Sequence, residues 1–421
     1  MSALISDRRR DLNRWRYKLV RKGTPTIHYF HQVDDPHSHL AVQKIPSITA
    51  NYDVRFEIHL CGRPSKSDQG DSSRFETWVL NDARNIADHY DVSLPKAVEK
   101  VETEQRENAE EKILRSLSEP NFPEIALEIG TKLWSGSRLY SENKSGNLTG
   151  EGNELRKKLG HWLSGTFYFE GEWYWGVDRL HHLEKRLLES DINSNNSSPI
   201  VKRPDENFNE EINASFLSLE FFPSLRSPYS AICFDRVISL AKKAQINLIL
   251  QPVIPMMMRG VSASRSKQIY IMTDAKREAE YYGQHLGPII DPIGAPVERA
   301  FEILPKLRKI DKDIEFCSNY LKAAWKEGVD ITSKAGLKKV VERSGVSWEE
   351  VNKDQERLNW KTLLDKNLNR MMDIGFWGVP SFNLTGGEMK NFSCWGQDRL
   401  WLLKREIEKR VVHLNKSSVN G

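Results

Sequence analysis

The chain has 421 residues, of which 39% are hydrophobic and 29% are charged, and its formal net charge is +4. This length exceeds one ordinary core and predicts a globular protein of two or three domains. The near balance of 62 basic and 58 acidic residues argues against a chain that coats nucleic acid. No window of about 18 consecutive apolar residues occurs, so we expect no membrane span and no membrane partner.

The first element predicted is a basic helix over residues 1–23, whose RRR cluster is typical of a solvated helix face. The segment has no apolar run of the length that a secretory signal needs. The chain has four cysteines, which are Cys61, Cys233, Cys317 and Cys394. None forms a C-x-x-C pair, which argues against a zinc knuckle or a dithiol redox motif and suits a reducing cytoplasm. We therefore predict a cytoplasmic protein.

The elements that follow divide the chain into two similar halves, 24–188 and 213–412. In the first half, VRFEIHL (Val54–Leu60) alternates as a strand does. A segment over 189–212, rich in Asn, Ser, Pro and charge, is predicted to be a linker. In the second half we expect a strand at Phe216–Phe222, a helix at Pro228–Ala244 and a strand at Ile246–Pro252. A helical region to about residue 372, two short strands, a terminal helix and a flexible tail over 413–421 complete the prediction.

Two stretches of the first half reappear, in the same order, in the second. IHYFHQVDDPHSHLA (Ile27–Ala41) resembles LEFFPSLRSPYSAIC (Leu219–Cys233), and both place a proline where a strand turns into a helix. The stretch Thr166–Leu187 resembles Ser381–Ile407 through a shared W-G-x-D-R sequence before a helix. A preserved order of matches is what a duplicated domain requires. A strand–helix–strand opening and a strand–strand–helix ending, with helices between them, is the thioredoxin-like plan.

The second half also resembles a known family. The pieces that carry the resemblance are LEFFPSLRSPYS, LILQPVIPMMMRG, SRSKQIYIMTDAKREAEYYG, AWKEGVDITSKAGLKKVVERSGVSWEE, GFWGVPSF and WGQDRLWLL, which together span most of 217–410. They are similar to kappa-class glutathione transferases and 2-hydroxychromene-2-carboxylate isomerases, within the DsbA-like thioredoxin superfamily. The first half resembles the same family more weakly, at its two ends. The resemblance implies an α/β fold of two tandem thioredoxin-like (DsbA-like) domains, each with a helical insertion.

The same resemblance implies a glutathione site in the second half. Ser227 would contact the glutathione sulfur and is the candidate catalytic residue. The remaining candidates for glutathione binding are Val379 and Pro380, which would form a cis peptide, then Gln397, Asp398 and Arg399 at the γ-glutamyl end, and Lys267. The loop that holds an asparagine in the family is shorter here, between Met258 and Lys267, so no asparagine is assigned.

Ser227 has a plain structural explanation beside the functional one. Ser at the N-cap followed by Pro at the first helical position is a strong helix start. The same hydroxyl still has a proton to donate, and a bound thiolate there would also lie at the positive end of the helix dipole. Asp398 and Arg399 likewise have two explanations. They form either a helix cap with a surface ion pair or a site where Asp398 pairs with the amino group of the γ-glutamyl end and the helix N-terminus binds its carboxylate. Pro380 as an ordinary turn and Lys267 as a solvated side chain are the corresponding alternatives.

The first half departs from this pattern. Asp35 replaces the serine and Gly165 takes the place of the proline, whereas Asp178 and Arg179 persist. An ionised carboxylate has no proton to donate to a thiolate and repels it. We therefore predict a degenerate, silent first site and, because the family is dimeric, an intramolecular pseudo-dimer of the two halves.

The histidines of the first half and the methionines of the second suggest two further sites. His28, His31, Asp34, Asp35, His37 and His39 have side chains that suit a divalent metal ion. Their spacing matches no metal motif, and strand alternation points His28 and His31 to opposite faces, so we expect no metal. Met256–Met258 either pack in the core or line an apolar substrate site.

Three functions remain open at this stage. The first is a glutathione-dependent isomerase or transferase, whose partners would be a small thiol and an apolar or aromatic electrophile. The second is a DsbA-family thiol–disulfide oxidoreductase, which needs an attacking cysteine near a helix N-terminus. The third is a pair of non-catalytic thioredoxin-like modules that bind other proteins.

Overall fold

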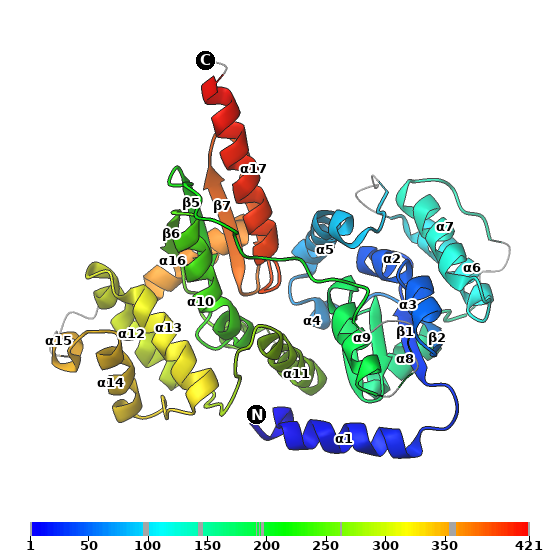
Figure 1. Ribbon diagram of the computed structural model, residues 1–421, viewed down its shortest axis with the longest axis horizontal. Coiled ribbons are helices and arrows are strands. Elements are labelled where there is room, and N and C mark those ends of the chain that lie inside the picture. Colours follow the sequence, from blue (N-terminus) through cyan, green and yellow to red (C-terminus); the bar gives the residue numbers. More distant parts are fainter. Residues whose placement is uncertain are drawn as a thin grey trace. The chain divides into compact units, whose positions relative to one another are not determined.

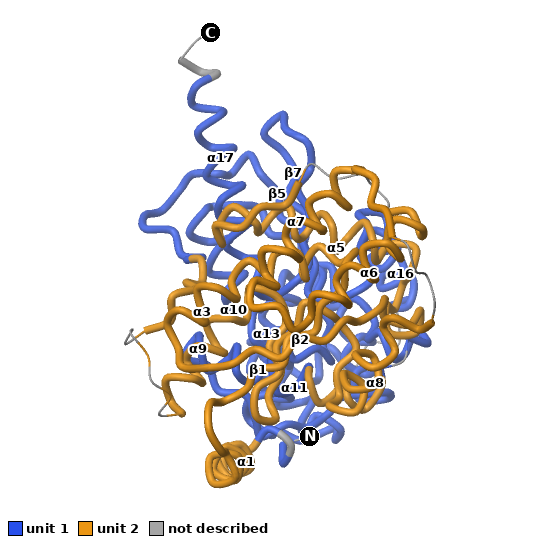
Figure 2. Tube along the Cα trace, turned by 90° about the vertical axis from the view of Figure 1, so that its right-hand side faces the viewer, with its two compact units in different colours: residues 1–5, 205–263, 271–421 blue, residues 6–204, 264–270 orange. Residues whose placement is uncertain are grey.

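The chain forms two compact units, each with its own four-stranded sheet (Figures 1 and 2). The structure, a computed structural model, describes residues 2–95, 101–141, 146–190, 192, 194, 198–261, 263–352 and 359–419. Unit 1 comprises residues 1–5, 205–263 and 271–421, and unit 2 comprises residues 6–204 and 264–270. No helix of the described residues is both long and apolar enough to span a membrane.

The sheet of unit 2 has the strand order β2-β1-β3-β4. Its strands are β1 (Thr26–His31), β2 (Arg55–Leu60), β3 (Thr166–Phe169) and β4 (Glu172–Trp175). Strand β1 pairs in parallel with β2 and antiparallel with β3, which pairs antiparallel with β4. The connection from β1 to β2 passes through helices, as a parallel pair requires.

The helices of unit 2 precede the sheet, join β1 to β2, fill the long connection from β2 to β3, and follow β4. They are α1 (Asp7–Val20), α2 (Pro36–Val42), α3 (Ile45–Asn51), α4 (Lys66–Gln69), α5 (Ser72–Ala87), η2 (Asp88–Tyr90), α6 (Thr103–Ser116), α7 (Phe122–Trp134), α8 (Gly150–Leu159), η3 (Val177–Arg179) and α9 (Leu180–Leu188). Helices α6 and α7 lie side by side (Figure 1).

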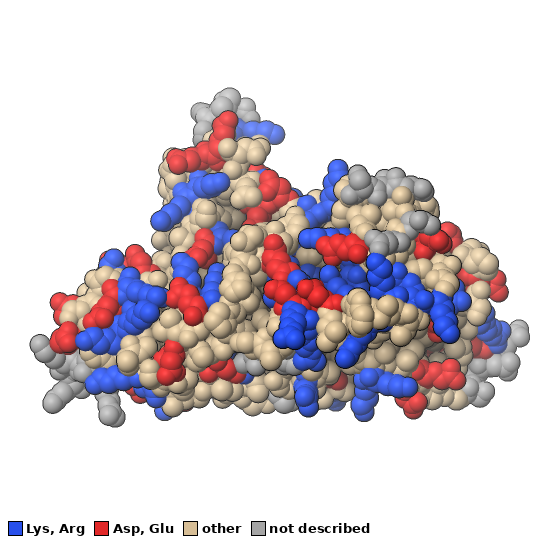
Figure 3. Space-filling view, turned by 60° about the horizontal axis from the view of Figure 1, so that its bottom comes forward, with Lys and Arg blue, Asp and Glu red and all other residues tan. Residues whose placement is uncertain are grey.

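Helix α1 is the basic helix predicted from the sequence, and acidic side chains of unit 2 hold it in place. Arg14 donates to Glu172 at 2.6 Å and to Glu189 at 3.0 Å, and Arg21 donates to Glu170 at 2.7 Å. On the face drawn in Figure 3, Lys and Arg side chains are interspersed with Asp and Glu. Arg14 and the C-cap residue Arg21 therefore have a structural role within the unit.

The sheet of unit 1 repeats this topology, with the strand order β6-β5-β7-β8. Its strands are β5 (Leu217–Phe222), β6 (Asn247–Leu250), β7 (Ser381–Gly386) and β8 (Phe392–Trp395). Strand β5 is parallel to β6 and antiparallel to β7, and β8 completes the sheet antiparallel to β7. The mixed α/β fold with a helical insertion in each half agrees with the prediction from sequence.

The helices of unit 1 connect β5 to β6 and form a larger insertion from β6 to β7, with η1 at the N-terminus and α17 after β8. They are η1 (Ser2–Ile5), α10 (Pro228–Lys243), η4 (Met256–Arg259), α11 (Arg265–Tyr281, whose first residues to Tyr270 belong to unit 2), α12 (Ala295–Lys309), α13 (Asp313–Lys322), η5 (Ala323–Glu327), α14 (Lys334–Arg343), α15 (Trp348–Asn352), α16 (Trp360–Asp373) and α17 (Leu400–Val419).

The structure differs from the predicted ends of the second half in two places. The tail expected over 413–421 is helical as far as Val419, since α17 continues through it. The linker expected over 189–212 contains no named helix or strand among its described residues, yet Val201 and Phe208 are buried. Phe208 packs in the core of unit 1, so the backbone is held at this point.

Helix α17 is attached to the β7–β8 hairpin by one fully buried arginine. Arg410 donates to the carbonyl oxygen of Gly386 at 2.8 Å and to that of Lys390 at 2.6 Å, and it pairs with Glu406 at 2.9 Å. Its guanidinium therefore joins the helix to two main-chain acceptors of the hairpin.

We predict that Arg410→Ala lowers the free energy of unfolding of unit 1 by about 2–4 kcal/mol, because the buried side chain loses its packing, its two bonds to the hairpin and its pair with Glu406. Urea unfolding of the full chain measures the change. Arg405→Ala, an exposed arginine of the same helix, is the control and should change stability by less than about 1 kcal/mol. Equal effects of the two substitutions would contradict the role given to Arg410.

Candidate functional site

Ser227 is the N-cap of α10 and lies just beyond the carboxyl end of β5. Its Oγ accepts the backbone N–H of Ser230 at 3.1 Å, and Pro228 occupies the first helical position. The side chain is 8% exposed, and no hydrogen bond that its hydroxyl donates is found among the described residues. The hydroxyl proton is therefore available to an acceptor that approaches from the surface.

Pro380 lies at the same end of the sheet. The Val379–Pro380 peptide is cis, and β7 begins at the next residue, Ser381, which pairs with Phe222 at the end of β5. The carbonyl oxygen of Pro380 accepts the N–H of Gly396 at 3.0 Å. This bond joins the proline to the loop that leads into α17. The candidate residues between 379 and 399 are therefore brought to the same end of the sheet.

Asp398 and Arg399 stand immediately before α17. Arg399 Nη1 lies 3.3 Å from Asp398 Oδ2, and the N–H of Arg399 donates to the carbonyl oxygen of Gly396 at 3.2 Å. The Arg399 side chain is buried, whereas Asp398 retains 13% exposure. An aspartate that is partly exposed next to a helix start can meet an amino group, with Arg399 holding it in position.

Gln397, by contrast, is fully engaged by the protein. Its Oε1 accepts from Arg236 Nη1 at 2.9 Å, and its Nε2 donates to the buried carboxylate of Glu278. Arg236 is in turn held by Glu206 and stacks on the ring of Tyr282 at 3.4 Å from its centroid. These bonds hold the side chain of Gln397 in place, and its role in glutathione binding stays a prediction.

Three residues that the sequence did not single out, Arg226, Asp291 and Arg259, link the residue before Ser227 and the segment of η4 to other parts of unit 1. Arg226 makes two 2.8 Å bonds to Asp291, and its Nη1 lies 3.1 Å from the sulfur of Met257. Arg259 donates to the carbonyl oxygen of Trp377 at 2.8 Å. The segment of η4 thus contacts both Arg226, which precedes Ser227, and Trp377, which lies near Pro380 in the sequence. Asp291 is 65 residues from Arg226 and leaves no local signal in the sequence.

Lys267 does not join this group within unit 1. It lies in the first turn of α11, in the part of that helix that belongs to unit 2. Its Nζ donates to the carbonyl oxygen of Asp68 at 2.9 Å and lies 5.2 Å from the ring centroid of Trp162. Burial lowers the pKa of this amine. The structure therefore gives Lys267 a packing role in unit 2 and offers no support for its assignment to glutathione.

The corresponding edge of unit 2 reproduces the backbone pattern with different side chains. The oxygen Oδ2 of Asp35 accepts the N–H of Ser38 at 2.9 Å and its hydroxyl at 2.7 Å, and so caps α2. Gly176 N–H donates to the carbonyl oxygen of Gly165 at 2.9 Å, as Gly396 does to Pro380. Gly165 has φ +64°, and a Cβ there would lie 2.9 Å from the amide nitrogen of Ser38. The alignment of Asp35 with Ser227 and of Gly165 with Pro380 thus agrees with the geometry.

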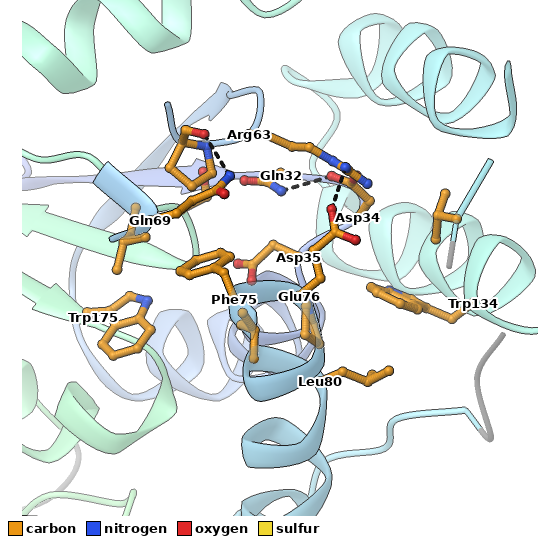
Figure 4. A pocket seen from close by; sticks show the side chains of 16 residues that line it. Gln32, Asp34, Asp35, Arg63, Gln69, Phe75, Glu76, Leu80, Trp134 and Trp175 are labelled. Carbon is orange, nitrogen blue, oxygen red and sulfur yellow. Dashed lines mark hydrogen bonds and ion pairs between the residues drawn. The ribbon is translucent and has the colours of Figure 1, made fainter. Parts of the chain in front are cut away.

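A cavity of about 60 Å³ lies beside Asp35 (Figure 4). Polar residues on one side include Asp34, which accepts from Gln32 at 2.9 Å and from Arg63 at 2.6 Å. The opposite side is lined by the apolar and aromatic residues Phe75, Val79, Leu80, Val101, Trp134, Leu163 and Trp175. Burial raises the pKa of Asp35.

Asp178 and Arg179, the other two candidates of the first half, are buried in η3 before α9. That the first site is silent stays a prediction.

The cysteines are poorly suited to redox chemistry. All four are free and buried. Cys233 lies in the second turn of α10, and burial raises its pKa to about 12, while burial raises the pKa of Cys61 to about 11. A thiol with so high a pKa is almost wholly protonated at neutral pH, whereas thiol–disulfide exchange requires the thiolate.

Comparison with known proteins places the fold of unit 1. Residues 218–408 match the family model of the DSBA-like thioredoxin domain. No curated protein sequence matches the chain. Similar solved structures include a 2-hydroxychromene-2-carboxylate isomerase (17% identity, 48% of this chain and 98% of the other, TM-score 0.35). Another is a putative protein disulfide isomerase from Nitrosomonas europaea (14% identity, 45% of this chain and 96% of the other, TM-score 0.35). A third is the cytosolic disulfide reductase DsbM from Pseudomonas aeruginosa with GSH (13% identity, 48% of this chain and 98% of the other, TM-score 0.34). At these identities and scores the similarities carry no information on activity.

Near the cavity of unit 2, one carboxyl group should make stability depend on pH. Burial raises the pKa of Glu110 from 4.5 to about 7, although Arg106 at 3.5 Å opposes the change. Because its folded-state pKa is the higher one, this group favours the folded state below pH 4.5. That contribution is lost as the pH rises through 7.

In the wild type, Glu110 should lower the free energy of unfolding of unit 2 by at most about 3 kcal/mol between pH 5 and pH 8. We predict that Glu110→Gln removes this decrease, so that the variant is more stable than the wild type at pH 8. Urea unfolding at both pH values, with Glu104→Gln on the same helix as the exposed control, measures it. An unchanged difference between pH 5 and pH 8 in Glu110→Gln contradicts the assignment.

Proposed function

We propose that unit 1 binds a small thiol, glutathione, and uses its thiolate to isomerise or conjugate an apolar or aromatic electrophile. The single observation that carries the proposal is the state of Ser227. Its oxygen caps α10 through Ser230, and its proton has no acceptor among the described residues. A thiolate placed there accepts that hydrogen bond and lies at the positive end of a 16-residue helix. Both effects favour the ionised thiol at neutral pH.

The surroundings of Ser227 suit the rest of the tripeptide. Pro380 immediately precedes β7 at the same end of the sheet, where the backbone of Val379 can pair with a peptide. Asp398 is partly exposed and can bind the γ-glutamyl amino group, while the first N–H groups of α17 can meet the carboxylate. Two opposite charges on one carbon then find complementary partners on adjacent residues.

The apolar substrate would lie beside the segment of η4. Met257 contacts Arg226 next to Ser227 and is 36% exposed, and its flexible thioether can adapt to a flat apolar surface. In an isomerisation, the thiolate forms a C–S bond to an α,β-unsaturated carbonyl compound and the C=C electron pair moves to the carbonyl oxygen. The single bond then rotates, the electron pair re-forms the double bond, and the thiolate leaves. The protein holds the two reactants in register and stabilises the thiolate before and after the step.

We expect one glutathione to bind per chain, and Ser227→Ala to weaken its binding by about ten- to hundredfold, since a hydrogen bond to a charged group is lost. Calorimetric titration measures the affinity, and ultraviolet absorbance of the bound thiolate measures its pKa, which should rise in the variant. S-methylglutathione is the matched ligand control because it has no thiolate, and its binding should change little.

Two further variants separate this proposal from the alternatives. Asp398→Asn should weaken both glutathione and S-methylglutathione, and Asp35→Ala should weaken neither. Because the loss of a cap costs about 1 kcal/mol, each variant is first checked for folding by circular dichroism. A folded wild-type chain that binds no glutathione would favour the protein-binding scaffold. Cysteine-dependent reduction of insulin disulfides would favour the oxidoreductase.

A further inference from the structure

His28, Glu57 and His59 converge on one face of the sheet of unit 2, away from the Asp35 edge. His28 is in β1, and Glu57 is its registered partner in the parallel strand β2. His59 follows Glu57 by two residues, so its side chain lies on the same face. The three side chains thus come together through strand pairing, over a sequence separation of about thirty residues.

The distances within this cluster, here called the His28–Glu57–His59 cluster, suit a single metal ion. His28 Nδ1 lies 3.0 Å from His59 Nε2, and Glu57 oxygens lie 3.8 Å from each of these two nitrogens. In tetrahedral coordination with bonds of about 2.1 Å, neighbouring ligand atoms are about 3.4 Å apart. One ligand atom from each of the three side chains lies within 4.8 Å of the other two, so rotation of the carboxylate and small shifts of the rings close the site.

Neighbouring rings hold both imidazoles in place. The ring of His59 stacks on Phe30, with centroids 4.9 Å apart, and the ring of His28 packs against Tyr168 at 6.0 Å. The side chains of His28 and His59 are 26% and 13% exposed, whereas Glu57 is 52% exposed. The cluster is therefore preorganised on the protein side and open to solvent on the other, where a fourth ligand can enter.

The electrostatics of the cluster also favour a cation. Burial lowers the pKa of His28, and it lowers the pKa of His59 to about 4. A neutral imidazole offers a lone pair at one ring nitrogen, and Glu57 supplies one negative charge. Arg55 is the opposing group, since its charge also lowers the pKa of His28. Its guanidinium donates to Thr26 at 3.0 Å.

We propose that His28, Glu57 and His59 form a zinc site with three protein ligands and a fourth position for water. Two imidazoles and one carboxylate are a ligand set that zinc takes in proteins, with an open position. The ion would tie β1 to β2 on the face opposite His31, which instead contacts Tyr29 and Phe122. The site is distinct from the glutathione proposal, which concerns unit 1.

The test is titration of Zn²⁺ into the full, untagged chain after treatment with a chelator and its removal, followed by calorimetry and by elemental analysis of the dialysed protein. We expect one zinc per chain. His28→Ala and His59→Ala should each weaken binding by at least about tenfold, because even the loss of an outer partner of a zinc ligand costs that much. The near-isosteric Glu57→Gln should weaken it in the same direction. His285→Ala, which removes an exposed histidine elsewhere, should leave it unchanged.

Co²⁺ provides a second readout that does not depend on affinity alone. Its visible absorption should show tetrahedral coordination in the wild type and lose intensity in His28→Ala and His59→Ala. Zinc should also raise the melting temperature of the wild type more than that of these variants, since it binds the folded state. No zinc binding by the folded wild type, or binding that survives both histidine substitutions, would falsify the proposal.

Discussion

The start of α10 is the feature on which the candidate site depends. A helix N-terminus has backbone N–H groups without partners, and the Ser227 oxygen satisfies one of them through Ser230. This bond fixes the side chain at the carboxyl end of β5, which is a central strand of the sheet. Because β5 pairs with both β6 and β7, the cap is surrounded by the loops that leave and enter these strands.

The same constraint operates in unit 2 with a different residue and a different outcome. Asp35 caps α2 as well as Ser227 caps α10, and the following residue is a proline in both cases. The difference lies in the remaining chemistry, because a serine that caps a helix can still donate a proton. An ionised aspartate can only accept, and its charge opposes that of a thiolate. One substitution at the cap therefore preserves the fold and changes which ligands the edge can take.

The two units also differ in how the space at that edge is filled. In unit 2, Gly165 approaches the first turn of α2 so closely that no side chain fits, and a cavity walled by Trp134 and Trp175 lies beside it. In unit 1, Pro380 occupies the corresponding position, and Arg226 and Met257 are neighbours of the cap. The repeated backbone thus carries two separate chemical environments.

The sequence by itself determined the elements that local patterns specify. Alternation in Val54–Leu60, the Ser227–Pro228 helix start and the repeated W-G-x-D-R motif predicted strands, helix starts and the thioredoxin-like order, because each depends on residues close together in the chain. Contacts across long separations needed the tertiary structure. Only the structure shows that Gln397 pairs with Arg236, that Lys267 packs within unit 2, and that His28 lies beside Glu57 and His59. Strand register and helix packing decide such pairs, and no short stretch of sequence encodes either of them.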